Sequence, residues 1–205
     1  MRFPRRDEAR LKVAREAALL LYTSQEKEYK QAKTKAARTL RLKVYPSNRE
    51  VAEELDRLAE EMEGKARADR LTKMRKEALR VMEALREFNP ILIGSVWRGT
   101  AHRNSDVDIE VYAEDPKVVT EKLRKKGFKV LRSERKSTGR DEDEGSPHIY
   151  LWSEGGFEVE LTIRPPEMQG KRRRCEVYGD YIVGLDVERL RKVLEEDPLR
   201  RFLPK

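Results

Sequence analysis

Cysteine and histidine are nearly absent from this sequence of 205 residues, which holds one cysteine, Cys175, and two histidines. A single thiol excludes an internal disulfide and cannot by itself build a zinc site. Long apolar runs are also missing: no stretch approaches the length of a membrane-spanning helix, and residues 1–4 begin no signal-peptide core. We therefore expect a cytoplasmic protein of a reducing compartment, with no membrane partner.

Charge is abundant and unevenly placed, with a formal net charge of +8. Residues 1–90 hold 23 basic and 16 acidic side chains, whereas the rest of the chain holds 23 and 22. Within the first half, the basic excess lies before Pro46. A basic flank of this kind is typical of a protein that binds nucleic acid. A solvated helical surface with a lysine bias is the alternative.

Three parts are expected along the chain: an N-terminal helical region (1–88), a central core (89–170) and a basic C-terminal segment with a short helix opened by Asp186 (171–205). Apolar residues recur at intervals of three and four over 7–42, 51–62 and 71–85, which predicts helices. Thr23-Ser24 bends or interrupts the first, and Ser47 to Glu50 form a capping box at the start of the second.

Further along, the pattern predicts one more helix, a loop and a cluster of cations. Asp115-Pro116 opens a helix that ends near Gly127, and a strand is expected over 128–132. Residues 136–145 are polar and contain four consecutive acids, which predicts a surface loop. Four adjacent cations at 171–174 cannot share one packed face, so we expect them to be solvated or bound to phosphate.

The most informative pattern lies between residues 91 and 111. An apolar run, 91–93, leads into Gly94-Ser95, as expected of a buried strand that enters a tight turn. Asp106 and Asp108 then alternate with apolar residues, which predicts a half-buried strand with both carboxylates on one face. Two neighbouring carboxylates repel each other unless a cation lies between them, and hard oxygen ligands suit magnesium.

A second acidic strand is predicted over residues 157–163, where Glu158 and Glu160 alternate with apolar side chains. Residues 153–156 have the composition of a hairpin turn, and 148–152 form the expected partner strand. A third carboxylate can therefore join the aspartate pair from another strand.

The Gly94-Ser95 turn, the helix-sized gap and the Asp106-x-Asp108 strand resemble the signature of the DNA polymerase β-like nucleotidyltransferase superfamily. Residues 147–160 are similar to the third-acid region of archaeal CCA-adding enzymes, so the chain resembles a short member of archaeal type. The resemblance matches Glu160, rather than Glu158, to the third acid, where the family more commonly has aspartate. It implies an α+β fold: a mixed β-sheet core flanked by helices, with an N-terminal helical region.

The resemblance also implies roles for individual residues. Asp106, Asp108 and Glu160 are the expected catalytic and metal-binding residues, which hold two Mg²⁺ or Mn²⁺ ions. The expected nucleotide-binding residues are Gly94, Ser95, Arg98 and Ser105. Arg98 is a phosphate contact on this view and part of a structural salt bridge on the alternative. Trp97 is expected in the core, and neither His102 nor His148 is expected to bind metal.

The implied reaction is transfer of an NMP from an NTP, such as ATP, to a hydroxyl acceptor, with release of pyrophosphate. The basic flank favours a nucleic-acid acceptor, in particular an RNA end. The same chemistry on a protein or small molecule, as in toxin–antitoxin and antibiotic-modifying relatives, is an alternative. An inactive nucleic-acid-binding relative is another. The N-terminal helices are a further candidate surface for oligomer formation.

Overall fold

The structure, a computed structural model, describes residues 6–135 and 145–204. Within these ranges four helices precede the sheet: α1 (Arg6–Tyr22), α2 (Tyr29–Leu40), α3 (Asn48–Glu63) and α4 (Lys65–Ala84). The expected break after α1 is present, and Ser24 within it has a φ of 56°. The capping box of α3 is confirmed, because Ser47 Oγ accepts from Glu50 N at 3.1 Å and Glu50 Oε2 accepts from Ser47 N at 2.7 Å.

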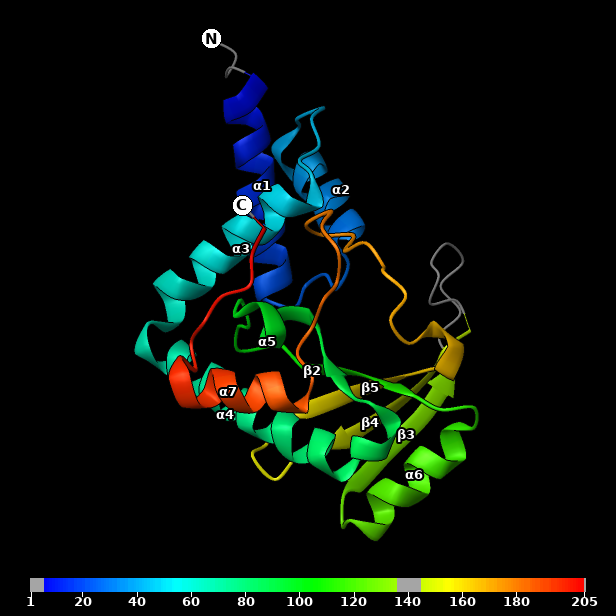
Figure 1. Cartoon of the computed structure of the whole chain (residues 1–205). Helices are drawn as coiled ribbons and strands as arrows, with labels where there is room; N and C mark the ends of the chain where they lie inside the picture. Colours follow the sequence, from blue (N-terminus) through cyan, green and yellow to red (C-terminus); the bar gives the residue numbers. More distant parts are fainter. Residues whose placement is uncertain (1–5, 136–144, 205) are drawn as a thin grey trace.

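The described strands form a mixed five-stranded sheet in the order β1-β2-β5-β4-β3 (Figure 1). Their bounds are β1 (Ile91–Leu92), β2 (Val107–Tyr112), β3 (Lys129–Arg135), β4 (Pro147–Trp152) and β5 (Glu158–Arg164). Strands β2 and β5 run parallel, and the other neighbours are antiparallel. The remaining elements are η1 (Arg86–Phe88), α5 (Gly94–Arg98), α6 (Pro116–Lys125), η2 (Pro166–Met168) and α7 (Val187–Glu196). The predicted α+β class is confirmed.

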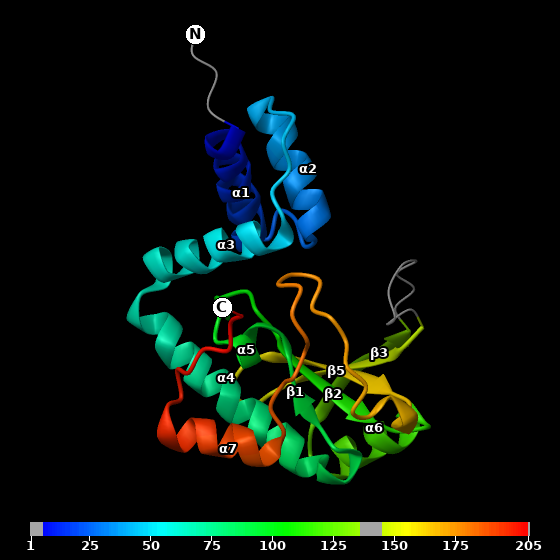
Figure 2. The ribbon, with the colours of Figure 1, turned by 45° about the horizontal axis from the view of Figure 1, so that its top comes forward.

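The two faces of the sheet differ in chemistry. Alternation sends apolar side chains of β2, β5 and β4 to one face, where they form the main core with α4, α6 and α7. Helices α4 and α6 cover this face, and α7 lies beside α4 (Figures 1 and 2). The other face is polar: β2 contributes Asp108 and Glu110, and β5 contributes Glu160 and Thr162.

Helices α1, α2 and α3 form a second, smaller core and stand on the side of the sheet away from α4 and α6 (Figure 2). Small side chains line their contacts, among them Ala17, Ala32 and Ala36, which are fully buried. Small residues allow helices to approach closely, which suits a module with few large apolar residues. Helix α4, in contrast, contributes its apolar face to the core under the sheet.

None of the helices in the described ranges is both long and apolar enough to cross a membrane. The loop expected at 136–145 lies, apart from Gly145, outside the described residues.

The C-terminal segment completes the sheet and the core. Leu185 pairs with Leu92, with backbone N–H to O distances of 2.8 and 3.0 Å, and so extends the sheet beyond β1. The helix expected after Asp186 is confirmed: the Asp186 side chain accepts from Arg189 N at 2.8 Å and caps α7. The chain after α7 then returns to α4 and α5.

Arg75 of α4 holds that returning tail. Its side chain is fully buried, and it donates to backbone oxygens of Val96 (3.1 Å), Trp97 (2.9 Å), Pro198 (2.7 Å) and Arg200 (2.8 Å). Burial lowers the pKa of Arg75 to about 10, so the guanidinium remains charged at neutral pH. One side chain therefore links α4, α5 and the C-terminal tail.

Replacing Arg75 by Met keeps an apolar stem and leaves four carbonyl groups without their donor, and two of these belong to the buried residues Val96 and Trp97. We expect the free energy of unfolding to fall by about 3 kcal/mol or more, because each buried group that loses its partner is costly. Urea unfolding measures the change. The control is Arg124→Met on the exposed side of α6, where we expect a change within about 0.5 kcal/mol. Equal stability of the two variants would contradict the role of Arg75.

Candidate metal centre and nucleotide site

Three carboxylates meet on the polar face of the sheet. Asp106 lies directly before β2, Asp108 lies within β2, and the parallel register places Asp108 opposite Glu160 of β5. One oxygen atom from each carboxylate lies within 4.8 Å of the others, and all three residues are partly buried. In the described ranges these residues form the only such group of three or more possible metal ligands.

The donor set fits a hard divalent cation. All three ligands are carboxylate oxygens, which Mg²⁺ and Mn²⁺ prefer over softer sites. Three acids this close repel one another, and a divalent cation offsets that repulsion. The structure therefore brings together the three acids expected from the sequence. Glu158, the other candidate for the third position, instead accepts from Arg132 Nη2 at 3.3 Å.

His148 of β4 holds the third carboxylate. Its Nδ1 lies 2.6 Å from Glu160 Oε1, and its side chain is buried. Its other ring nitrogen, Nε2, is buried without a hydrogen-bond partner among the residues described. The sequence marked His148 only as a strand histidine. Its contact with Glu160 follows from the antiparallel β4–β5 pairing, in which His148 lies opposite Thr162 and Tyr150 opposite Glu160.

An imidazole that holds a metal-ligating carboxylate fixes the orientation of that ligand, and loss of such a partner typically lowers metal affinity 10–100-fold. We expect His148→Leu to raise the Mn²⁺ concentration needed for half-saturation about tenfold or more. His148→Asn places an amide near the position of Nδ1 and should restore most of the affinity. Calorimetric Mn²⁺ titration measures both. Equal affinity of the Leu variant and the unmodified protein would contradict this role.

Gly94 lies directly against the metal-site carboxylate. Its φ is +69°, a conformation that favours glycine, and a Cβ built on it would fall 2.0 Å from Asp108 Oδ2. The backbone supports the same contact, because Ile93 N donates to Asp108 O at 2.9 Å. Ser95, the next residue, lies in the first turn of α5.

Gly94→Ala should displace the Asp108 carboxylate as well as strain the backbone. We expect Mn²⁺ affinity to fall at least tenfold, with the fold retained in circular dichroism. The matched control is Gly127→Ala, because Gly127 also has a positive φ (+83°) but has open space around the missing Cβ. That variant should lose only about 1 kcal/mol of stability from backbone strain. If both variants bound Mn²⁺ normally, the close approach of Gly94 would be irrelevant to the site.

Arg98 takes part in a buried ion pair. It is 3% exposed and donates to both carboxylate oxygens of Asp180, at 2.7 and 3.1 Å, and to Phe202 O at 3.0 Å. Its guanidinium also lies over the rings of Trp97 (4.4 Å) and Tyr178 (4.6 Å). Of the two roles expected for Arg98, phosphate contact or structural salt bridge, this arrangement matches the salt bridge. It ties α5 to the C-terminal segment.

Ser105 closes the turn that precedes Asp106. Its Oγ accepts from His102 N at 3.0 Å, and its own N–H donates to His102 O at 2.9 Å. Burial lowers the pKa of His102; Glu63 opposes this shift and nearby arginines add to it.

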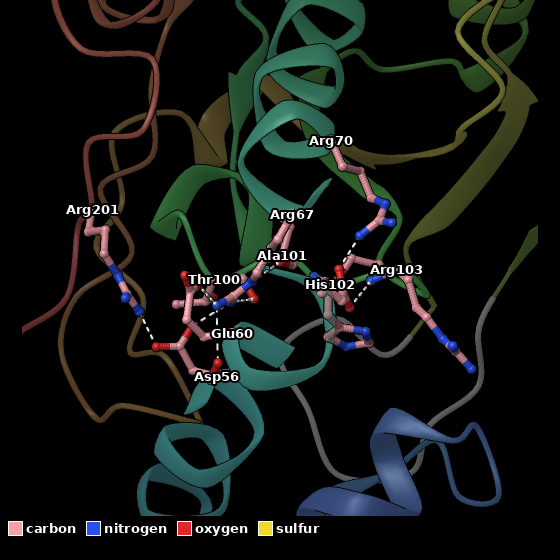
Figure 3. Close-up of polar contacts among 11 residues, drawn as sticks. Asp56, Glu60, Arg67, Arg70, Thr100, Ala101, His102, Arg103 and Arg201 are labelled. Atoms are coloured by element: carbon pink, nitrogen blue, oxygen red, sulfur yellow. Dashed lines mark hydrogen bonds and ion pairs between the residues drawn. The ribbon is translucent and has the colours of Figure 1, made fainter. Parts of the chain in front are cut away.

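The loop between α5 and Asp106 is held by Arg67 of α4 (Figure 3). Arg67 is 5% exposed and donates to Thr100 O (3.0 Å) and Ala101 O (2.9 Å) on the loop. On α3 it donates to Asp56 Oδ1 (2.5 Å) and Glu60 Oε2 (2.9 Å). Arg67 is not among the residues expected at the site from the sequence. A signal was available, because Arg67 precedes Leu71 and Met74 by helical intervals and so falls on the buried stripe of α4.

The second anchor of this loop also comes from the α3–α4 region. Arg103 N donates to Glu63 Oε1 at 2.9 Å, and Glu63 pairs with Arg70 (Figure 3). Asn104 Nδ2 donates to Tyr22 O of α1 at 2.6 Å. Helices α1 and α3 therefore contact the segment that leads into Asp106.

The basic run 171–174 corrects one expectation. Arg173 is neither solvated nor available for phosphate: it pairs with Glu110, a carboxylate that is only 3% exposed. Arg164 Nε completes this group at 2.9 Å from Glu110 Oε1. A buried carboxylate needs cationic partners. For Glu110 these are Arg164 on β5 and Arg173 in the following loop, and no local sequence pattern predicts that either residue contacts Glu110. Arg174, in contrast, donates to Gly179 O at 3.0 Å and lies over Tyr181.

Comparison with known families assigns the central part of the chain. Residues 75–174, which contain all three carboxylates, match the family model described as a nucleotidyltransferase domain. This segment is a nucleotidyltransferase domain. For this segment, the superfamily expected from the sequence and its nucleotidyltransferase class are thereby confirmed. The matched segment runs from within α4, through the whole sheet, to the loop that carries Arg173.

Solved structures resemble the chain over about half of its length. One is a cytoplasmic RNA terminal U-transferase, with 23% identity over 47% of this chain and 29% of that chain and a TM-score of 0.35. Another is the Cid1 poly(U) polymerase, with 21% identity over 47% and 31% and a TM-score of 0.36. The match therefore spans less than a third of each of those proteins. No curated protein matches the sequence.

Proposed function

We propose that the protein transfers an NMP from an NTP to the terminal hydroxyl of a nucleic acid, an RNA end in the first place, and releases pyrophosphate. The observation that carries this proposal is the meeting of Asp106, Asp108 and Glu160 within 4.8 Å inside a nucleotidyltransferase domain. These three residues would hold two Mg²⁺ or Mn²⁺ ions. When bound, the ions lower the pKa of the acceptor hydroxyl and neutralise charge on the phosphates.

The donor side of the site is the turn at Gly94-Ser95. Gly94 lies against Asp108, and Ser95 Oγ and the amides of this turn would donate hydrogen bonds to the triphosphate. Ser105 shapes the turn before Asp106. We assign Arg98 to positioning α5, because its guanidinium already donates to Asp180 and to Phe202 O. In the reaction, the acceptor oxygen bonds to the α-phosphorus while the bond from that phosphorus to the pyrophosphate oxygen breaks.

The acceptor side is Glu160, which lies across β2 from the turn. Strand β4 lies next to β5 on the side away from β2. We place the approach of the acceptor hydroxyl on this side, away from the Gly94-Ser95 turn. The proposed acceptor is a polyanion because the chain has a net charge of +8 with its excess in the N-terminal part. Helix α2, for example, has four basic side chains and no acid.

The direct test is incubation of the purified protein with each α-labelled NTP and Mg²⁺, together with RNA, DNA or a protein fraction. We expect label on the RNA end. Label on protein or a small molecule would instead support the alternative acceptors, and no label in any arm would contradict the proposed activity.

The matching variant is Asp108→Asn, which keeps the size of the side chain and removes its charge. We expect transfer to fall at least 1,000-fold (about 4 kcal/mol in the barrier), with an unchanged circular dichroism spectrum. Glu121→Gln, an exposed acid on α6, is the control and should keep full activity. Normal transfer by the Asp108 variant would contradict the metal assignment.

A further inference from the structure

The row of side chains that holds the third carboxylate continues across the sheet. Strand register places Asp108 beside Glu160, Glu160 beside Tyr150, and Tyr150 beside Arg132. All four residues occupy the polar face. In Figure 1, β4 and β3 lie on the far side of β5 from β2 and α5. The row therefore leads from the metal site along the side from which the acceptor would approach.

Arg132 and Tyr150 form a stacked pair at the end of this row. The guanidinium carbon of Arg132 lies 3.7 Å from the centre of the Tyr150 ring, and Tyr150 is only 3% exposed. The Arg132 side chain is 51% exposed, so the stack presents a flat cation to solvent. Glu158 accepts from Arg132 Nη2 at 3.3 Å and restrains the plane of the guanidinium. Such planes are surfaces on which bases stack.

Trp152 extends the same surface. It lies two residues beyond Tyr150 on β4, opposite Glu158 on one side and Lys129 on the other. It is 49% exposed, whereas the other tryptophan of the chain, Trp97, is 4% exposed. A large aromatic side chain with half its surface open, beside a stacked arginine and an exposed lysine, is typical of a single-strand binding surface.

We propose that Trp152, Arg132 and Lys129 form an acceptor platform, on which the bases next to the reacting end of a single-stranded nucleic acid stack. This inference rests on the proposed function. Neighbouring strands lie about 4.8 Å apart, which puts Arg132 about 10 Å from the strand of Glu160, a span of one to two nucleotides. The aromatic ring and the guanidinium plane stack on any base, so the platform binds without strong sequence preference.

Tryptophan fluorescence tests the platform without any reaction. With no metal or NTP present, a short unstructured RNA oligonucleotide should quench the emission of Trp152, the exposed tryptophan. A base-free polyanion, polyphosphate of equal charge, should not. Equal quenching by polyphosphate, or no quenching by RNA, would overturn the proposal.

Variants separate stacking from charge. We expect Trp152→Ala and Arg132→Lys each to raise the Kd of a fluorescein-labelled oligonucleotide, and the KM for the RNA acceptor, about tenfold or more, with the KM for NTP unchanged. Trp152→Phe keeps a stacking ring and should keep most of the affinity. Arg124→Lys on α6 is the same substitution outside the platform and should leave the Kd and the KM for RNA unchanged.

The results of these experiments show separately whether the acceptor platform and the proposed transferase activity are correct. If RNA is extended but Trp152→Ala and Arg132→Lys keep normal Kd and KM, the platform is wrong and the proposed activity stands. If RNA quenches Trp152 and the variants lose binding but no transfer is found, the platform stands and the proposed activity is wrong.

Discussion

The segment between Gly94 and Asp106 is held by buried arginine side chains, which donate hydrogen bonds to its backbone carbonyls. The geometry of the site depends on these hydrogen bonds. Arg67 binds the carbonyls of Thr100 and Ala101, and Arg75 binds those of Val96 and Trp97. A buried guanidinium is stable only when its donors are used, so these contacts allow little freedom in the loop. This loop joins the Gly94-Ser95 turn to Asp106, the first of the three clustered acids.

These arginines also join distant parts of the chain to the site. Arg67 brings in acids of α3, and Arg75 brings in the C-terminal tail through Pro198 and Arg200. Arg98, within α5, pairs with Asp180 from the C-terminal segment. The helical module and the C-terminal segment therefore support the geometry of a domain whose family match ends at residue 174. We therefore expect substitutions in either to shift the three clustered acids without replacing any of them.

Local patterns were sufficient to predict most elements and the three acids. Alternation placed Asp106 and Asp108 on one face of a strand, and capping residues marked the starts of α3, α6 and α7. Contacts between segments far apart in the sequence could not be predicted this way. The pairing of Arg98 with Asp180, and of Arg173 with Glu110, depends on how loops cross the sheet. The contact of His148 with Glu160 depends on the register of β4 and β5, which no local pattern specifies.

The central claim is that Asp106, Asp108 and Glu160 hold two metal ions beside the Gly94-Ser95 turn. The most direct measurement is anomalous diffraction from crystals grown with Mn²⁺ and a non-hydrolysable NTP analogue. We predict two manganese peaks within the group of Asp106, Asp108 and Glu160, and triphosphate density against Ser95. Manganese elsewhere in the chain, or a triphosphate bound away from this turn, would contradict the account.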